Sequence, residues 1–158
     1  MKMGTRFLGA VILAGAFLQA AGAQDVDLID KALATQKFNM FLSLARDADL
    51  TFELKGSGPY TIFAPTDEAF TSRYTKSQLD ALRGNRNRLR QILLHHVVRG
   101  RVDAVSAVKM GYIHPMEGTA IPTRIVGGRG MIDGARFVVT NVNASNGILH
   151  GIDKVLVP

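Results

Sequence analysis

Two adjacent histidines, His95 and His96, and two adjacent carboxylates, Asp67 and Glu68, are the side chains of this sequence best suited to chemistry. Imidazoles can bind a metal ion or transfer a proton, and paired carboxylates can act as general acid and base. A helix that binds a metal, however, places two ligands four residues apart on one face, which adjacent histidines cannot do. We therefore expect one of the histidines to face the core with its hydrogen bonds satisfied, and we predict no metal site.

The carboxylates have a simpler interpretation as the start of a helix. Asp67 and Glu68 follow Pro65 and Thr66, and acidic residues at this position are typical of a first helical turn. The sequence contains no cysteine, no Gly-x-Ser-x-Gly nucleophile turn and no glycine-rich phosphate loop. We therefore expect no catalytic residue and no cofactor, and a hydrolase that uses the two carboxylates is kept as an alternative.

Arginine is concentrated in the middle of the chain, where Arg83, Arg86 and Arg90 are spaced to line one side of a helix. One interpretation is a solvated face that keeps the domain soluble. The other is a patch that binds an anionic polysaccharide, a lipid headgroup or an acidic protein. Nucleic acid is not an expected partner, because no aromatic residues interleave the arginines for base stacking. The formal net charge of +6 is compatible with an anionic partner but does not require one.

The N-terminal residues 1–23 have the composition of a secretory signal peptide. A short basic start precedes an apolar run from Phe7 to Ala20, and Ala21-Gly22-Ala23 supplies the small residues of a cleavage site. The apolar run is shorter and richer in glycine than a membrane span, which needs about 20 residues. We therefore expect cleavage near Ala23, secretion to the periplasm or the extracellular space, and a mature chain without a transmembrane span.

Residues 24–158 are expected to form one domain with helices first and strands last. The predicted helices include Asp25 to Thr35, and the predicted capping box Thr75-Lys76-Ser77-Gln78 opens another. In the second half, the dipeptides Asp133-Gly134 and Asn146-Gly147 predict tight turns between antiparallel strands. Helices followed by strands with mostly antiparallel connections are the α+β pattern.

Three segments, in this order, resemble the fasciclin-like domain family. Tyr60 to Phe70 (YTIFAPTDEAF) resembles the first signature of the family, and Asn146 to Pro158 (NGILHGIDKVLVP) resembles its closing segment. Between them, Ile92 to Val98 falls where the family carries a Tyr-His pair, with His95 in place of the tyrosine. The positions that match the signatures are Thr61, Phe63, Ala64, Pro65, Thr66, Phe70, His96, Asn146, Gly147, His150 and Asp153.

The resemblance implies a compact wedge of β-strands with several helices packed around it, as in small secreted bacterial members with a single domain. It implies no cofactor and a role in adhesion or in contact with an extracellular or cell-envelope protein. We therefore expect a secreted or cell-surface interaction module without catalytic activity, and binding of an anionic polysaccharide or lipid surface is the alternative. The candidate contact residues are His95, His96, Arg83, Arg86 and Arg90.

The signature residues also have roles that follow from local physics. Ile62 and Phe63 should point to opposite faces of one strand, which predicts a strand covered on both sides. Thr66 is expected to cap a helix. The closing segment carries apolar residues on both of its sides, which indicates a central strand. Because His150 and Asp153 lie inside this apolar run, each should have a hydrogen-bond partner.

Overall fold

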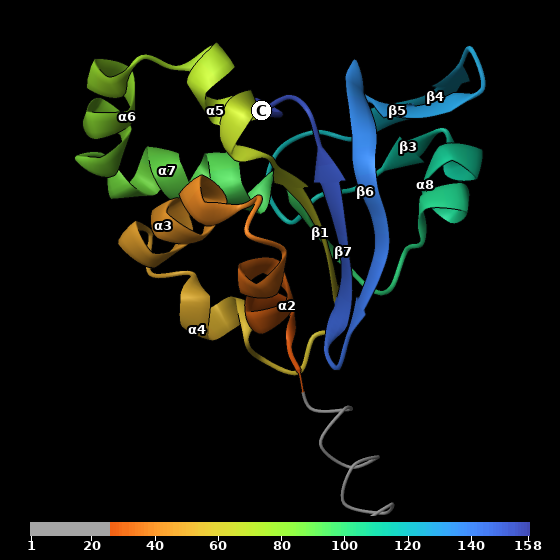
Figure 1. The fold of residues 1–158 in the computed structure, drawn as a ribbon, viewed down its shortest axis with the longest axis horizontal. Helices are drawn as coiled ribbons and strands as arrows, with labels where there is room; N and C mark the ends of the chain where they lie inside the picture. The colour runs from red at the N-terminus through yellow and green to blue at the C-terminus, as the bar shows by residue number, and fades with distance from the viewer. Residues whose placement is uncertain (1–25) are drawn as a thin grey trace, which may run out of the picture.

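A single seven-stranded sheet organises residues 26–158, the part of the chain that the computed structural model describes (Figure 1). The predicted signal peptide at residues 1–23 lies outside this part. The strands are β1 (Tyr60–Pro65), β2 (Val97–Arg99), β3 (Tyr112–Ile113), β4 (Ile121–Val126), β5 (Arg129–Ile132), β6 (Ala135–Ala144) and β7 (Gly147–Ile152). Their order in the sheet is β2-β1-β7-β6-β5-β4-β3. Neighbouring strands are antiparallel except β1 and β7, which run parallel.

Helices cover the sheet on both sides. They are α2 (Leu28–Thr35), α3 (Asn39–Asp47), α4 (Thr51–Leu54), α5 (Asp67–Arg73), α6 (Lys76–Arg83), α7 (Arg86–Leu94) and α8 (Ala104–Met110). Helices α2 to α7 gather on one side of β1 and β7, and α8 lies on the other side, beside β3 to β6 (Figure 1). The predicted α+β class, with a helical first half and mostly antiparallel strands in the second, is confirmed.

Short polar residues begin several of these helices, as their spacing predicts. Thr66 accepts a hydrogen bond from the Ala69 amide at the start of α5, and the Thr75–Gln78 capping box opens α6. The first described helix begins at Leu28 and not at Asp25, because Asp27 is the N-cap residue and its carboxylate accepts from the Asp30 amide.

The closing segment runs through the centre of the domain. Strand β7 lies between β1 and β6, and all six of its residues are buried. The strand ends at Ile152, so the last residues of the segment continue as irregular backbone. The predicted central strand is therefore confirmed for the first half of the segment.

Two hydrophobic clusters lie on opposite faces of the central strands. Ile62 belongs to the larger cluster, which packs against α2, α3 and α7, whereas its neighbour Phe63 belongs to the smaller cluster beneath α8. The prediction that β1 is covered on both faces is confirmed. Because β1 and β7 are buried on both sides, they read as nearly continuous apolar runs in the sequence.

Candidate functional site

The signature residue Asn146 acts as a buried connector between distant segments. Its side-chain oxygen accepts a hydrogen bond from the Leu28 amide at 2.9 Å, and its side-chain nitrogen donates to the carbonyl oxygens of Leu54 and Gly56 at 2.9 and 2.7 Å. The turn before β7 is formed by Ser145 and Asn146, and Gly147 is already the first residue of the strand. Asn146 therefore joins α2, α4 and the loop before β1. The sequence predicted only a turn at this position, and these three long-range hydrogen bonds were not expected.

Gly147 is needed because β1 approaches it closely. A Cβ atom built on Gly147 would overlap the carbonyl oxygen of Tyr60, its partner in the parallel pair. Thr61 performs a related task on the other side of β1. Its buried hydroxyl donates to the Gly100 carbonyl oxygen at 2.7 Å and accepts from the Val102 amide at 2.8 Å. Both residues fix backbone segments and offer no group to a partner.

The remaining matched positions of the first signature are packing and capping residues. Phe63, Ala64 and Phe70 are fully or almost fully buried, and Pro65 closes β1 opposite Ile152. Thr66 caps α5 as described above. These residues therefore build a strand-to-helix corner in the interior.

His96 is completely buried and fully hydrogen-bonded. Its Nδ1–H donates to the Ile92 carbonyl oxygen at 2.7 Å, and its Nε2 accepts from the Leu156 amide at 2.8 Å. These partners define the neutral tautomer that carries its proton on Nδ1. Burial away from water lowers the pKa of His96 to about 3, only partly opposed by the bond to Ile92. His96 is thus a neutral structural residue that holds the C-terminal segment.

His150 has a matching arrangement in the second cluster. Its Nδ1 accepts from the Asn141 amide at 3.0 Å, and its Nε2–H donates to the Val102 carbonyl oxygen at 2.8 Å. Its ring stacks on Phe63, with 5.3 Å between the centroids. Burial lowers the pKa of His150 as well. The predicted hydrogen-bond partners of His150 are therefore present.

Asp153 also has its predicted partner. Its carboxylate accepts from the Arg136 amide at 2.7 Å, and its own amide donates to the Arg136 carbonyl oxygen at 3.1 Å. This pair prolongs the contact between β6 and the closing segment beyond the end of β7. Asp153 is half-buried, so this backbone contact lies at the rim of the sheet.

The two candidate contact histidines are not on the surface. His95 is 2% exposed, and its Nδ1–H donates to the Glu117 carbonyl oxygen at 2.9 Å beneath Gly118. Since His96 is buried too, the expectation that only one of the pair faces the core was too narrow. Neither side chain can touch a partner unless the covering loop moves. Within residues 26–158, no three metal-ligating side chains cluster together.

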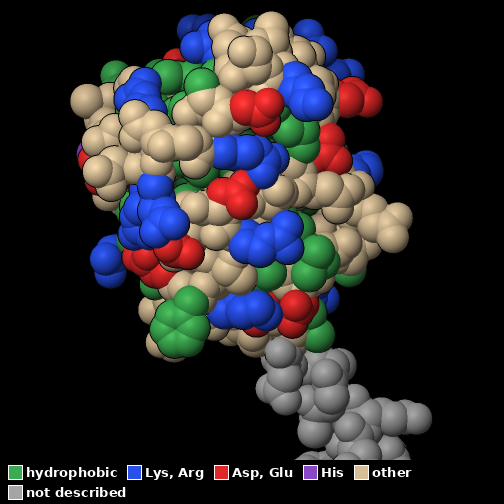
Figure 2. Space-filling model, turned by 90° about the vertical axis from the view of Figure 1, so that its left-hand side faces the viewer, with side chains coloured by type: hydrophobic (Ala, Val, Ile, Leu, Met, Phe, Trp, Pro, Cys, Tyr) green, Lys and Arg blue, Asp and Glu red, His purple; other side chains and the backbone are tan. Residues whose placement is uncertain are grey.

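The candidate contact arginines do not form one helical stripe. Arg83 ends α6, whereas Arg86 and Arg90 belong to α7, so the predicted single helix face is wrong. Each arginine also has an acidic partner from α3, α4 or the turn between them. Arg83 pairs with Asp47, Arg86 with Asp49 at 2.7 Å, and Arg90 with Glu53 at 3.3 Å. Figure 2 shows basic and acidic side chains interspersed on this side of the molecule.

Asp67 is likewise occupied by a structural task. Its carboxylate accepts from the Met40 amide at 2.7 Å and from the Asn39 side chain at 3.4 Å, at the start of α3. The N-cap residue Phe38 has no side-chain acceptor of its own, so Asp67 replaces one. Asp67 and Glu68 both lie in the first turn of α5, so the helix-start interpretation is supported, and Asp67 has a structural role in addition.

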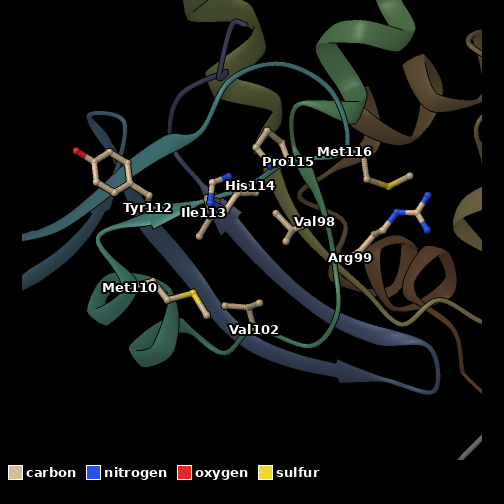
Figure 3. A pocket seen from close by; sticks show the side chains of 9 residues that line it. All are labelled: Val98, Arg99, Val102, Met110, Tyr112, Ile113, His114, Pro115 and Met116. Carbon is tan, nitrogen blue, oxygen red and sulfur yellow. The ribbon is translucent and has the colours of Figure 1, made fainter.

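A hollow with a largely apolar lining lies between the two edge strands β2 and β3 (Figure 3). We call it the edge groove, and its volume is about 480 Å³. Its side chains come from β2, the segment before α8, the end of α8, and β3 with the following loop. They are Val98, Arg99, Val102, Met110, Tyr112, Ile113, His114, Pro115 and Met116.

The edge groove combines a buried floor with exposed rims. Val98, Val102 and Ile113 are buried, whereas Met110 and Tyr112 are 58% and 60% exposed. In Figure 3, Tyr112 stands at one side of the groove and the Arg99 guanidinium at the other. Large exposed apolar side chains grouped around a hollow are typical of a surface that binds another molecule.

Little in the sequence indicates this groove, because the two strands that border it have only three and two residues. Another residue missed by sequence reasoning is Arg101. Its guanidinium donates to the carbonyl oxygens of Ala144, Ser145 and Gly147 at 2.9 to 3.1 Å and so clamps the last turn. The closely spaced apolar residues Met110, Tyr112 and Ile113 are the sequence signal that could have indicated the groove.

Among residues 26–158, no helix combines the length and the apolar character needed to cross a bilayer.

The fold places this chain in a class of α+β domains in which a parallel terminal strand is threaded through an otherwise antiparallel sheet. Comparison with known families identifies it further. The chain belongs to the fasciclin family, since the Fasciclin domain profile matches residues 36–158. The resemblance inferred from the signature segments is therefore confirmed.

Relatives and a solved structure agree with this assignment. The chain is 32% identical to protein sll1483 of Synechocystis over 142 residues, which cover 89% of this chain and 78% of that protein. It is 28% identical to pig transforming growth factor-beta-induced protein ig-h3, of which it spans only 21%. A FAS1 domain pair from the insect cell adhesion molecule fasciclin I shares the fold, with a TM-score of 0.75 and 16% identity over 87% of this chain and 52% of the insect chain.

Proposed function

We propose that the chain is an exported, non-catalytic binding domain that contacts another protein of the cell envelope or extracellular space through the edge groove. The observation that carries this proposal is the groove itself, which exposes Met110 and Tyr112 above a buried apolar floor. Of the residues best suited to chemistry, by contrast, His95, His96 and Asp67 are engaged in internal hydrogen bonds. The insect relative is named a cell adhesion molecule, which supports the same direction.

Export is part of the proposal and rests on the sequence of residues 1–23. Their basic start, apolar run and small residues favour a cleaved signal peptide, with cleavage near Ala23. N-terminal sequencing of the protein recovered from culture medium or periplasm would test it. A chain that begins near Gln24 agrees with the proposal, and a chain that retains its N-terminus contradicts it.

Binding of an anionic polysaccharide or lipid through the arginines has weaker support. Arg86 and Arg90 are already paired with carboxylates. Because the charges of such surface ion pairs largely cancel and are screened by salt, they attract an external anion only weakly. We expect the chain and its double variant Arg86→Glu, Arg90→Glu to elute from heparin resin at closely similar salt concentrations. Much earlier elution of the double variant would revive the polysaccharide alternative.

Photo-crosslinking in cells that produce the protein tests the proposed surface. A photoreactive residue at Met110 should yield a protein adduct, whereas the same residue at Lys76, exposed on α6, should not. The same photoreactive residue at Arg86 tests binding through the surface that carries Arg86 and Arg90. Adducts from Arg86 alone, or equal adducts from all three positions, would contradict binding at the edge groove.

A further inference from the structure

We propose, building on the proposed function, that the partner enters the edge groove as an extended peptide with a carboxylate and pairs with the free edge of β3. The domain would then bind by strand addition, in which main-chain hydrogen bonds provide affinity and alternate side chains provide specificity. Three features of the groove support this mode: a free main-chain edge, an apolar floor and an unpaired cation.

The free edge follows from the pairing of β3 with β4. Tyr112 lies opposite Pro122 and Ile113 opposite Ile121, and the Thr123 amide donates to the Gly111 carbonyl oxygen at 2.8 Å. In an antiparallel ladder, hydrogen-bonded and non-hydrogen-bonded pairs alternate. The Tyr112 pair is therefore of the second kind, which agrees with the lack of an N–H on Pro122. Its main-chain N–H and C=O point away from β4.

His114 lies one residue beyond the end of β3, and an added strand that prolongs β3 to this residue would use the N–H and C=O groups of both Tyr112 and His114. Within residues 26–158, no hydrogen bond joins these groups to another residue. An added strand could therefore make four main-chain hydrogen bonds with β3.

The facing edge, β2, limits how the added strand can lie. The Met116 amide donates to the Val97 carbonyl oxygen at 2.8 Å and closes the groove at one end. Beyond this bond, Arg99 has its main-chain groups directed away from β1, because the bonds from Phe63 to His96 and from Gly100 to Pro59 fix the alternation. The groove is thus bordered by free strand edges on both sides.

The floor and the charge of the groove define the chemistry of the peptide. Every second side chain of an added strand would point to the floor formed by Val98, Val102 and Ile113, which favours small apolar residues there. The lining contains no carboxylate, and among residues 26–158 the Arg99 guanidinium has no acidic partner. An aspartate or glutamate next to the apolar residues would complement this cation.

A free amphiphile would use the floor and Arg99 but would leave the main-chain groups of Tyr112 and His114 without partners. A second copy of this chain would pair its own β3 or β2 edge and would reveal itself as self-association. The free ladder of β3 favours a peptide over the amphiphile, and the lone cation favours an acidic peptide over a second, net positive copy.

The test uses a seven-residue probe, Thr-Val-Thr-Val-Glu-Val-Thr, blocked at both ends, and the mature chain labelled for NMR. We expect shift changes centred on the Tyr112 and His114 amides, with exchange of both amides slowed about tenfold at saturation. A probe with lysine in place of glutamate should bind about fivefold more weakly. A probe N-methylated on alternate residues, which lacks the amides needed for the ladder, should not bind.

Charge-reversal variants complete the test. Arg99→Glu should reverse the preference, so that the lysine probe binds more tightly than the glutamate probe. Arg88→Glu is the matched control, because Arg88 is exposed on α7 away from the groove, and it should leave both affinities unchanged.

The outcomes separate this inference from the proposed function. Binding without protection of the Tyr112 and His114 amides, or binding of the N-methylated probe, would overturn strand addition. Absence of probe binding while Met110 still crosslinks would overturn the acidic peptide but leave the groove as the contact surface. If the probe does not bind and Met110 does not crosslink, both proposals are overturned. If the β3 signals broaden with increasing protein concentration in the absence of probe, a second copy of the chain is favoured as the occupant instead.

Discussion

Mild acid should destabilise this domain chiefly through His96, which is buried and neutral in the folded chain. Its Nδ1–H donates a hydrogen bond to the Ile92 carbonyl oxygen, and its Nε2 accepts one from the Leu156 amide. A second proton would have to bind to Nε2 and would therefore displace the Leu156 amide. Burial accordingly lowers the pKa of His96 from 6.5 to about 3. Acidification from pH 7.5 to 5.0 is therefore a perturbation directed at this residue.

The sign and size of the effect follow from proton linkage. Below pH 6.5 the unfolded chain binds a proton at His96 that the folded chain excludes down to about pH 3. The free energy of unfolding then falls by about 1.4 kcal/mol per pH unit, or about 2 kcal/mol between pH 7.5 and 5.0. The lowered pKa of His150 acts in the same direction. The carboxylates of Asp27 and Asp103, whose pKa values are also lowered, lose their contribution only at more acidic pH.

Urea denaturation at the two pH values provides the measurement. The wild-type chain should lose at least about 2 kcal/mol, while His96→Gln, which lacks the titrating ring, should lose about 2 kcal/mol less than the wild type over the same interval. His114→Gln is the matched control, since His114 is exposed, and it should behave as the wild type. A wild-type loss below about 0.5 kcal/mol, or an undiminished loss in His96→Gln, would refute the reasoning.

Three further predictions concern the closing segment. Asn146→Ala removes three hydrogen bonds, two of them buried and one partly buried, and should lower the free energy of unfolding by about 2–4 kcal/mol in urea titrations; a loss below about 1 kcal/mol would contradict the connector role. Gly147→Ala places a methyl group on the Tyr60 carbonyl oxygen, and its circular dichroism should show a largely unfolded chain; a cooperative transition near that of the wild type would speak against the close approach. Asp153→Ala removes one acceptor at the rim of the sheet and should cost about 0.5–1.5 kcal/mol, and an unchanged melting temperature would dismiss the tether.

Local sequence signals predicted the elements whose physics is local. Thr66 and the Thr75–Gln78 box begin helices because their side chains reach amides three residues away, a distance that the sequence itself specifies. Apolar residues on both sides of the closing segment likewise predicted a central strand, because burial on both faces removes the need for polar residues.

The parts that sequence reasoning missed depend on contacts between distant segments. The ion pairs of Arg86 and Arg90 use acidic residues about 37 positions earlier in the chain, so the arginines alone resembled a basic patch. Strand β3 and helix α4 comprise two and four residues, too few to show a period. The edge groove requires both sheet edges at once, and nothing in the spacing of its residues brings β2 next to β3.

The binding role of the edge groove is tested most directly by hydrogen–deuterium exchange of the chain in complex with a partner captured through the Met110 crosslink. Our account predicts that exchange slows within residues 97–116 and stays unchanged across α6 and α7. Protection confined to residues 76–94, or no protection around the groove, would contradict it.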